Sequence, residues 1–200
     1  MSPSLWITLA AVLILVSISL VAAVGTKYEF VFENDEIFDE CADMENVHGV
    51  HDLFDTSNLQ FQFNEGSITI SGEVKCLWEG VQPTDRIENR VELLKYVRGA
   101  WQPTPFSMFF NNFCDIFYDE KNLYYRLWTK NILEEDRKCF NVYMHVLRHR
   151  TFEVDTIIEF PVKMDGQHKL VIHYIAYDEN NVKRPIEGCF EIHGEFFKVK

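Results

Sequence analysis

Two histidines, His145 and His149, stand four residues apart in the segment MHVLRH. On a helix this spacing places both imidazoles on one face, where such pairs bind zinc. The residues that follow alternate between apolar and polar types, which predicts a strand, and residues four apart on a strand lie roughly 13 Å from each other. The sequence therefore predicts no metal site at these histidines.

Acidic side chains crowd a second segment, near residues 29–45. They are Glu29, Glu33, Asp35, Glu36, Asp39, Glu40, Asp43 and Glu45. Carboxylates at this density suggest calcium, but the segment lacks the D-x-[DN]-x-[DN]-G loop and its closing glutamate. We interpret the run as a solvated acidic surface.

Other residue types that could do chemistry lie in strand-like patterns. His173 and His193 are interpreted as surface or hydrogen-bonded core histidines, and Cys76, on the apolar face of its segment, as a buried thiol. The sequence contains no G-x-S-x-G, H-E-x-x-H or P-loop motif. We therefore expect a protein that is not an enzyme and needs no cofactor.

Most of the chain alternates with a period of two, which predicts half-buried antiparallel strands. The alternation is seen in YEFVFEN, LQFQFNE, SITISGEVKCLW, TFEVDTIIEF and CFEIHGEFF, whereas KLVIHYIAYD is apolar on both faces and predicts a central strand. Turn signals rich in Gly, Pro, Asn and Asp separate these segments. The pattern predicts a mostly β domain built as an antiparallel sandwich or barrel.

Phenylalanines are dense where one predicted strand gives way to a helical pattern. The stretch PTPFSMFFNNFCDIFYD runs from Pro103 to Asp119, and apolar residues recur every three or four positions from Asn112 to Glu134. This spacing predicts one or two short helices near residues 112–134. The rings either fill an ordinary core or line a hollow at the mouth of the sandwich, and the composition leaves both open.

The N-terminal segment is uncharged from Leu5 to Gly25 and ends in small residues. It predicts a secretory signal peptide over residues 1–25, followed by a single domain over residues 26–200, with an uncleaved membrane anchor as the alternative. The net charge of −12 argues against a nucleic-acid partner. In an oxidising extracellular compartment the five cysteines allow two disulfides and one remaining thiol, with the pairing left open.

Four segments carry a resemblance to a known family: FENDEIFDEC, GAWQPTPFSMFFNNFCDIFYD, WTKNILEEDRKC and GQHKLVIHYIAYDENNVKRPIEGCFEIHGEF. They are similar to the insect CheB chemosensory proteins, which are relatives of the GM2-activator and of the MD-2-related lipid-recognition proteins. The resemblance covers about Lys27 to Lys200. It implies an antiparallel β-cup, in which two sheets splay at one end around an apolar cavity that accepts lipid chains.

The resemblance also implies the covalent framework and the function. Cys114 would pair with Cys139 and Cys41 with Cys189, which leaves Cys76 free. The expected function is that of a secreted, non-enzymatic protein that binds a lipid or long-chain hydrocarbon in chemosensation. It would present an apolar cue, such as a pheromone, to a receptor or ion channel.

The predicted cavity residues come from the inward faces of the strands and from the strand–helix junction. They are Trp78, Leu93, Trp101, Phe106, Met108, Phe110, Phe113, Phe117, Ile158, Phe160, Leu170, Ile172, Tyr174, Phe190 and Ile192. An alternative function is a protein–protein module, in which the interior is solid and the acidic segment Glu29–Glu45 binds a basic receptor surface. A continuous apolar cavity favours the first function, and a packed interior favours the second.

Overall fold

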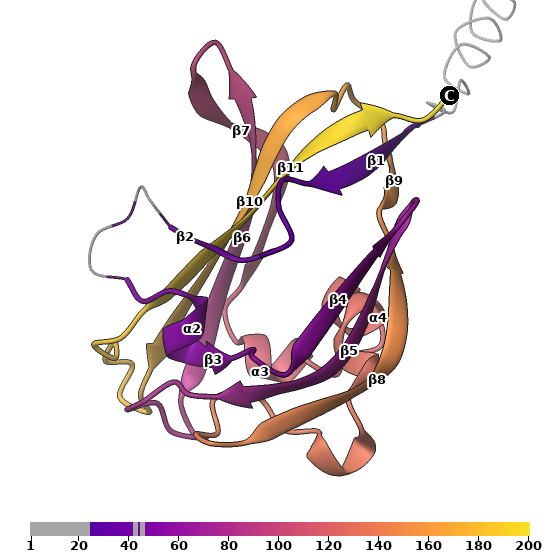
Figure 1. The fold of residues 1–200 in the computed structure, drawn as a ribbon. Coiled ribbons are helices and arrows are strands. Elements are labelled where there is room, and N and C mark those ends of the chain that lie inside the picture. Colours follow the sequence, from indigo (N-terminus) through magenta and orange to yellow (C-terminus); the bar gives the residue numbers. More distant parts are fainter. Residues whose placement is uncertain (1–24, 42–43, 45–46) are drawn as a thin grey trace, which may run out of the picture.

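A computed structural model describes residues 25–41, 44 and 47–200. The predicted signal peptide lies almost wholly outside the described residues, so its prediction stays open. Within the described residues, the strands form two antiparallel sheets, one of seven strands and one of four. Figure 1 shows the two sheets as opposite walls of a cup, with the few short helices toward its closed end. The fold is the mostly β sandwich or cup that the sequence predicts.

The larger sheet has the order β7–β6–β10–β11–β1–β9, and a short strand, β2, also pairs with β11. Its strands are β1 (Thr26–Phe32), β2 (Asp39–Glu40), β6 (Arg86–Val97), β7 (Ala100–Phe110), β9 (Ile157–Phe160), β10 (Gly166–Tyr177) and β11 (Gly188–Lys198). The doubly apolar segment forms β10, which lies between β6 and β11. Its inward face carries Leu170, Ile172 and Tyr174, and its outer face carries Lys169 and His173 beside Val171 and Ile175.

The smaller sheet is built around β5 (Ser67–Cys76). It pairs with β3 (Phe54–Asp55), β4 (Leu59–Asn64) and β8 (Val146–Asp155), and a one-turn helix, α2 (Val50–Leu53), precedes β3. A register shift between Ile70 and Gly72 marks a β-bulge, which bends the paired strands. Gly72 is required there, because its φ is +104° and an added Cβ would lie 1.9 Å from the Asn58 carbonyl oxygen.

The segment TFEVDTIIEF is not one strand, as its alternation predicts, but two strands in different sheets. The chain leaves β8 in the smaller sheet and enters β9 in the larger sheet at Thr156, which is buried. The Thr156 N–H donates to the Gly66 carbonyl at 2.9 Å, and the Phe30 N–H donates to the Thr156 carbonyl at 2.9 Å. Thr156 therefore joins the two walls of the cup along one edge.

A helical segment follows β7 and packs against β6 and β8. It contains α3 (Phe113–Ile116), α4 (Leu123–Leu127) and two short 3₁₀ helices, η1 (Thr129–Asn131) and η2 (Glu134–Asp136). The structure contains the disulfide Cys114–Cys139, which ties the two ends of this segment together, and the disulfide Cys41–Cys189, which ties the chain after β2 to β11. Both pairings are those that the family resemblance implies. Two disulfides fit a protein of an oxidising compartment.

The main hydrophobic core closes the bottom of the cup. Trp78 stacks on Phe140, and Phe113 packs against both Phe140 and Tyr174, with ring centroids 5.8 and 5.7 Å away. Cys76 is fully buried here as a free thiol, and burial raises its pKa to about 12, so it stays protonated. No helix in the described part of the chain is long and apolar enough to cross a bilayer.

An ion pair fastens the helical segment to the smaller sheet. The guanidinium of Arg148, on β8, donates to both carboxylate oxygens of Asp136, on η2, at 2.6 and 2.8 Å. These hydrogen bonds from Arg148 hold the pKa of Asp136 below its ordinary value. The pair therefore stabilises the fold wherever the carboxylate is ionised in both the folded and unfolded states.

We expect the stability difference between the wild-type protein and Asp136→Asn to depend on pH. A carboxyl whose folded pKa is lowered contributes its full stabilisation above the unfolded pKa of about 4, and loses it as the pH falls through the folded value. Urea unfolding between neutral and strongly acidic pH measures this difference. The control is Asp165→Asn in the exposed pair with Lys163, and an equal pH-dependent difference in the control would contradict the prediction.

Candidate ligand-binding cup

The walls of the cup carry large apolar side chains that are only half-buried. On β7 the inward residues Phe106, Met108 and Phe110 alternate with the exposed residues Pro105, Ser107 and Phe109. Other half-buried apolar residues that face the same space are Leu93, Leu170, Ile192, Phe61, Phe152 and Val154. In a solid sandwich these positions would be fully buried, because the opposite sheet would cover them. The interior of the cup is therefore partly open.

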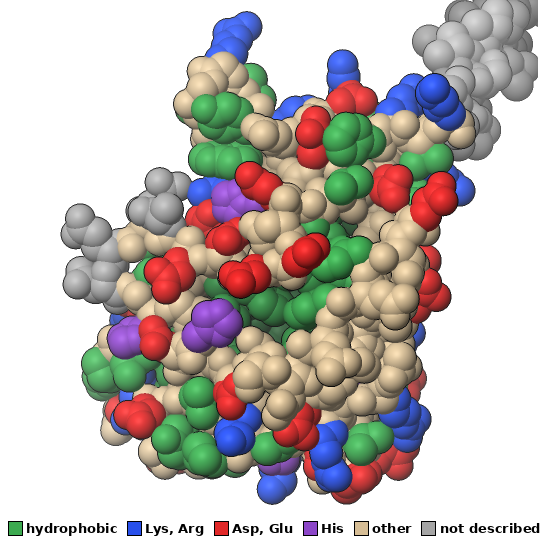
Figure 2. Space-filling model, in the orientation of Figure 1, with side chains coloured by type: hydrophobic (Ala, Val, Ile, Leu, Met, Phe, Trp, Pro, Cys, Tyr) green, Lys and Arg blue, Asp and Glu red, His purple; other side chains and the backbone are tan. Residues whose placement is uncertain are grey.

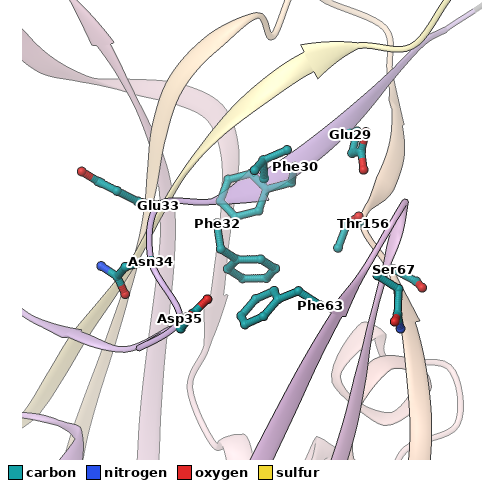
Figure 3. Close-up of a pocket in the computed structure, with 11 residues that line it drawn as sticks. Glu29, Phe30, Phe32, Glu33, Asn34, Asp35, Phe63, Ser67 and Thr156 are labelled. Carbon is teal, nitrogen blue, oxygen red and sulfur yellow. The ribbon is translucent and has the colours of Figure 1, made fainter.

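The mouth of the cup is a cavity of about 280 Å³ between the two walls. Phe30 and Phe32 enter it from β1 and Phe63 from β4, with the Phe30–Phe32 and Phe32–Phe63 ring centroids 5.2 and 5.5 Å apart. Figure 3 shows Phe32 and Phe63 side by side, with Phe30 above them. Figure 2 shows the same region as a hollow with hydrophobic side chains at its bottom. Phe63 is 39% exposed, so its ring is accessible to a ligand.

The rim of this cavity is polar and acidic. Its lining includes the carboxylates Glu29, Glu33 and Asp35 together with Asn34, Asn64, Ser67 and Thr156, and it includes no lysine or arginine. One carboxylate has a structural role, since Glu29 accepts a hydrogen bond from the Gly66 N–H at 2.9 Å. The rim therefore presents negative charge and hydrogen-bond acceptors beside an aromatic interior. Such a rim repels anions and is compatible with neutral or cationic ligands.

A second cavity, of about 210 Å³, lies beside β3 and is lined by His51, Phe54, Asp55, Thr56, Ser57 and Leu77. The Ser57 hydroxyl donates to the Asp55 carboxylate at 2.6 Å, and this hydrogen bond lowers the pKa of Asp55. An activated serine instead donates its proton to a base such as imidazole. The serine, histidine and aspartate of this cavity therefore do not have the arrangement of a nucleophilic site.

The structure distributes fourteen of the fifteen predicted cavity residues over four environments. Six lie buried in the main core: Trp78, Phe113, Phe117, Ile172, Tyr174 and Phe190. Four half-buried residues pack against that core from the walls: Met108, Phe110, Leu170 and Ile192. Phe160, Leu93 and Phe106 belong to a separate cluster around Tyr28 and Phe196, and Ile158 is 42% exposed on the edge strand β9. None of the fifteen lines the 280 Å³ cavity, and their contact with a ligand stays a prediction.

Trp101 lies on the wrong face for its predicted role. Its ring packs 5.7 Å from the His193 ring and 5.2 Å from the Lys169 ammonium. These residues alternate along β11 and β10 with the inward residues Ile192 and Leu170, so their side chains leave the opposite face of the sheet. Trp101 is therefore on the outside of the cup, which contradicts the prediction that it faces the cavity.

The residues that line the mouth were not among the predicted cavity residues. Phe30, Phe32 and Phe63 stand in the alternating segments YEFVFEN and LQFQFNE, which the sequence identifies only as strands. Their alternation is no different from that of strands whose inward faces are fully covered. A usable signal was the acidic residues that flank these phenylalanines, Glu29, Glu33 and Glu65, since carboxylates beside a row of rings indicate that the row ends at solvent.

The two histidines with zinc-like spacing are held apart by the fold. The His145 ring nitrogen Nε2 lies 2.6 Å from the Asp136 carbonyl, whereas His149 is buried on β8 between aromatic rings. Among the described residues, no group of three or more His, Cys, Asp or Glu side chains is placed to hold a metal ion.

Comparisons with known proteins do not identify a family for the chain. No family model matches the chain, and no curated protein matches its sequence. The resemblance to the CheB proteins therefore stays a prediction.

Proposed function

We propose that this chain is a secreted, non-enzymatic protein that binds a lipid or long-chain hydrocarbon in chemical sensing. The apolar part of the ligand would lie between the two sheets, and the loaded protein would present it to a receptor or ion channel. The single observation that carries the proposal is the half-buried apolar lining of the cup, which opens to solvent at Phe63. Exposed apolar surface of this kind is costly unless it binds something.

The size of the opening is compatible with this proposal. Its volume of about 280 Å³ is close to the lower end of the roughly 300–1,000 Å³ that ligand sites occupy. A hydrocarbon chain gains about 0.8 kcal/mol for each methylene that it buries. The half-buried rings of Phe61, Phe106 and Phe152 extend the apolar surface beyond the mouth. A hydrocarbon chain that reaches past the mouth would therefore make apolar contacts along the walls.

Secretion and chemosensation have separate support. The uncharged N-terminal segment and the two disulfides are what a secreted protein needs. The similarity to the CheB proteins supports the chemosensory part of the proposal. Mass spectrometry of the protein purified under native conditions from a eukaryotic secretion system measures the cleavage site and any bound lipid in one experiment.

We expect Phe63→Asp to weaken the binding of an uncharged fluorescent probe, N-phenylnaphthylamine, by about tenfold or more. The substitution places a carboxylate at the apolar mouth, where a ligand would have to desolvate it, at a cost of roughly 1–3 kcal/mol. Because Phe63 is already 39% exposed, the variant should fold. Fluorescence titration measures the binding, and circular dichroism checks the strands.

The matched control is Phe109→Asp. Phe109 lies on β7 with its side chain on the outer face, where it is 58% exposed and contacts the Arg90 guanidinium. This variant adds the same charge to an exposed phenylalanine but leaves the cup unchanged, so probe binding should stay within about twofold. Equal binding by the wild-type protein and both variants would place the probe outside the cup and argue against the proposal.

A receptor-binding module without a lipid is the second candidate function. The carboxylates Glu29, Glu33 and Asp35 and the net charge of −12 favour it, because they could steer a basic partner to the rim. The fluorescence titration with N-phenylnaphthylamine distinguishes the two functions. A folded wild-type protein that binds neither the probe nor a copurified lipid would support the module.

A further inference from the structure

His149, on β8, carries two buried ring nitrogens that have no hydrogen-bond partner in the structure. Its side chain is only 8% exposed, and its ring lies 4.8 Å from the Trp128 ring and 6.1 Å from the Phe152 ring. Buried polar atoms are paired in the large majority of cases, and leaving one unpaired costs roughly 1–3 kcal/mol. Both ring nitrogens of His149 therefore lack a well-formed hydrogen bond within the protein, and a ligand that supplies one would remove this cost.

The charge state of this imidazole limits what the partner can be. Burial lowers the pKa of His149 to about 4, although weak backbone hydrogen bonds with Gly72 and Leu147, which fall short of full hydrogen-bond geometry, act in the opposite direction. The ring is therefore neutral at physiological pH, with one N–H donor and one acceptor nitrogen. It can hydrogen-bond a hydroxyl or carbonyl group, but it offers no positive charge to a carboxylate.

The position of His149 connects it to the cup. Opposite Gly72 on β5, it follows the same face as Leu147, Phe152 and Val154, whose partners Val74, Ile70 and Ile68 are buried between the sheets. Its neighbours Trp128 and Phe152 are half-buried and belong to the same hydrophobic cluster as Phe32, which lines the mouth. Apolar side chains thus lead from the mouth of the cup to the His149 ring.

We propose that the ligand of the cup is an uncharged amphiphile whose hydroxyl or carbonyl oxygen hydrogen-bonds to the ring of His149. This inference rests on the proposed lipid-binding function and names the chemical class of the lipid. A plain alkane would leave both ring nitrogens unpaired. A fatty-acid anion would pass the carboxylates Glu29, Glu33 and Asp35 at the rim and would reach a neutral ring without gaining an ion pair.

His168, on β10, provides an internal comparison. It is also fully buried, and its Nε2 has no partner. Its Nδ1, however, donates to the Gly166 carbonyl at 2.8 Å, and its ring packs against Phe196 in the separate cluster around Tyr28. One of its nitrogens is thus hydrogen-bonded within the protein, although Phe196, which its ring contacts, lies 4.9 Å from the Phe30 ring at the mouth. His168 is therefore the control for a buried histidine whose ring is already anchored to the backbone.

The test measures the binding of dodecanol, methyl laurate, laurate and dodecane to the secreted full-length protein by displacement of N-phenylnaphthylamine. We expect the ratio of dodecanol affinity to dodecane affinity to fall about fivefold to tenfold in His149→Phe, because only dodecanol loses a hydrogen bond. At neutral pH, laurate should bind the wild-type protein about tenfold more weakly than dodecanol. Using the ratio removes the general effect of the substitution on apolar binding.

Three further variants decide the outcome. His168→Phe should leave the ratio within about twofold of the wild-type value, and His149→Gln, which keeps a donor and an acceptor, should retain most of the ratio. His149→Leu repeats the comparison if the larger ring does not fit. Ligand-free His149→Phe should melt no lower than the wild-type protein, because it removes an unpaired polar group.

Two results would overturn the inference while leaving the lipid carrier intact. One is an unchanged ratio in both folded apolar variants of His149, and the other is a loss of the ratio in His168→Phe alone. If neither the displacement probe nor any of the four dodecyl compounds binds the folded wild-type protein, the proposed function itself fails.

Discussion

Replacing Cys41 and Cys189 together by alanine lowers the free energy of unfolding by about 5 kcal/mol. The disulfide joins residues 148 positions apart. In the unfolded state it therefore restricts the chain over almost the whole length of the domain. Domains of this size have a total stability of roughly 5–15 kcal/mol. The double variant should therefore be marginally stable, and guanidinium unfolding of the oxidised proteins measures the loss.

The second disulfide is the control for this prediction. Cys114 and Cys139 are 25 positions apart, and the same loop-closure argument gives about 3.5 kcal/mol for their removal. The difference between the two variants tests chain entropy rather than the general loss of a covalent bond. Equal losses, or a smaller loss for the Cys41–Cys189 pair, would show that local contacts around the bridges dominate their contribution.

Lys169→Met destabilises the protein by roughly 3–5 kcal/mol, because it leaves a buried carboxylate without its cation. The Lys169 ammonium lies 2.9 Å from the Glu191 carboxylate, and both side chains are only 3% exposed. The pair sits on the outer face of the larger sheet, where the Trp101 ring covers the ammonium and His193 lies 2.7 Å from the same carboxylate. Urea unfolding at neutral pH measures the effect.

The double variant Lys169→Met, Glu191→Leu distinguishes the loss of the ion-pair attraction from the cost of leaving the Glu191 carboxylate buried without Lys169. Since replacing both members of a buried pair by apolar groups is often nearly neutral, this variant should recover most of the stability that Lys169→Met loses. Lys163→Met in the exposed pair with Asp165 should change stability by less than about 1 kcal/mol. A single variant as mild as this surface control would contradict the prediction.

The local pattern of the sequence was sufficient for the strands but not for their assignment to sheets. Alternation identified β5 and β11, and a run that is apolar on both faces identified β10. The same alternation runs through Thr156 without a break, although the chain changes sheets there. A period of two reports which face is apolar, and it carries no information about which strand pairs with which. The topology of the cup depends on contacts between distant segments.

The candidate site was harder to predict than the fold for a related reason. Phe113 and Phe32 are both inward-facing phenylalanines, yet the first is fully buried in the floor and the second is half-buried at the mouth. The Phe113 ring packs against Phe140 and Tyr174, whereas the Phe32 ring packs against Phe63 at the opening, and no local pattern encodes these contacts between distant residues. The importance of His149 was equally hidden, because only the structure shows that its ring nitrogens lack partners.

The peptide unit at Thr156 restricts how the walls can move apart. Its two hydrogen bonds, one to Gly66 and one to Phe30, tie both layers to the same backbone position, so that side of the molecule has a fixed spacing. A bulky ligand that needs more room must rotate the two sheets about the edge at Thr156. The displacement is then smallest at Thr156 and grows with distance from it.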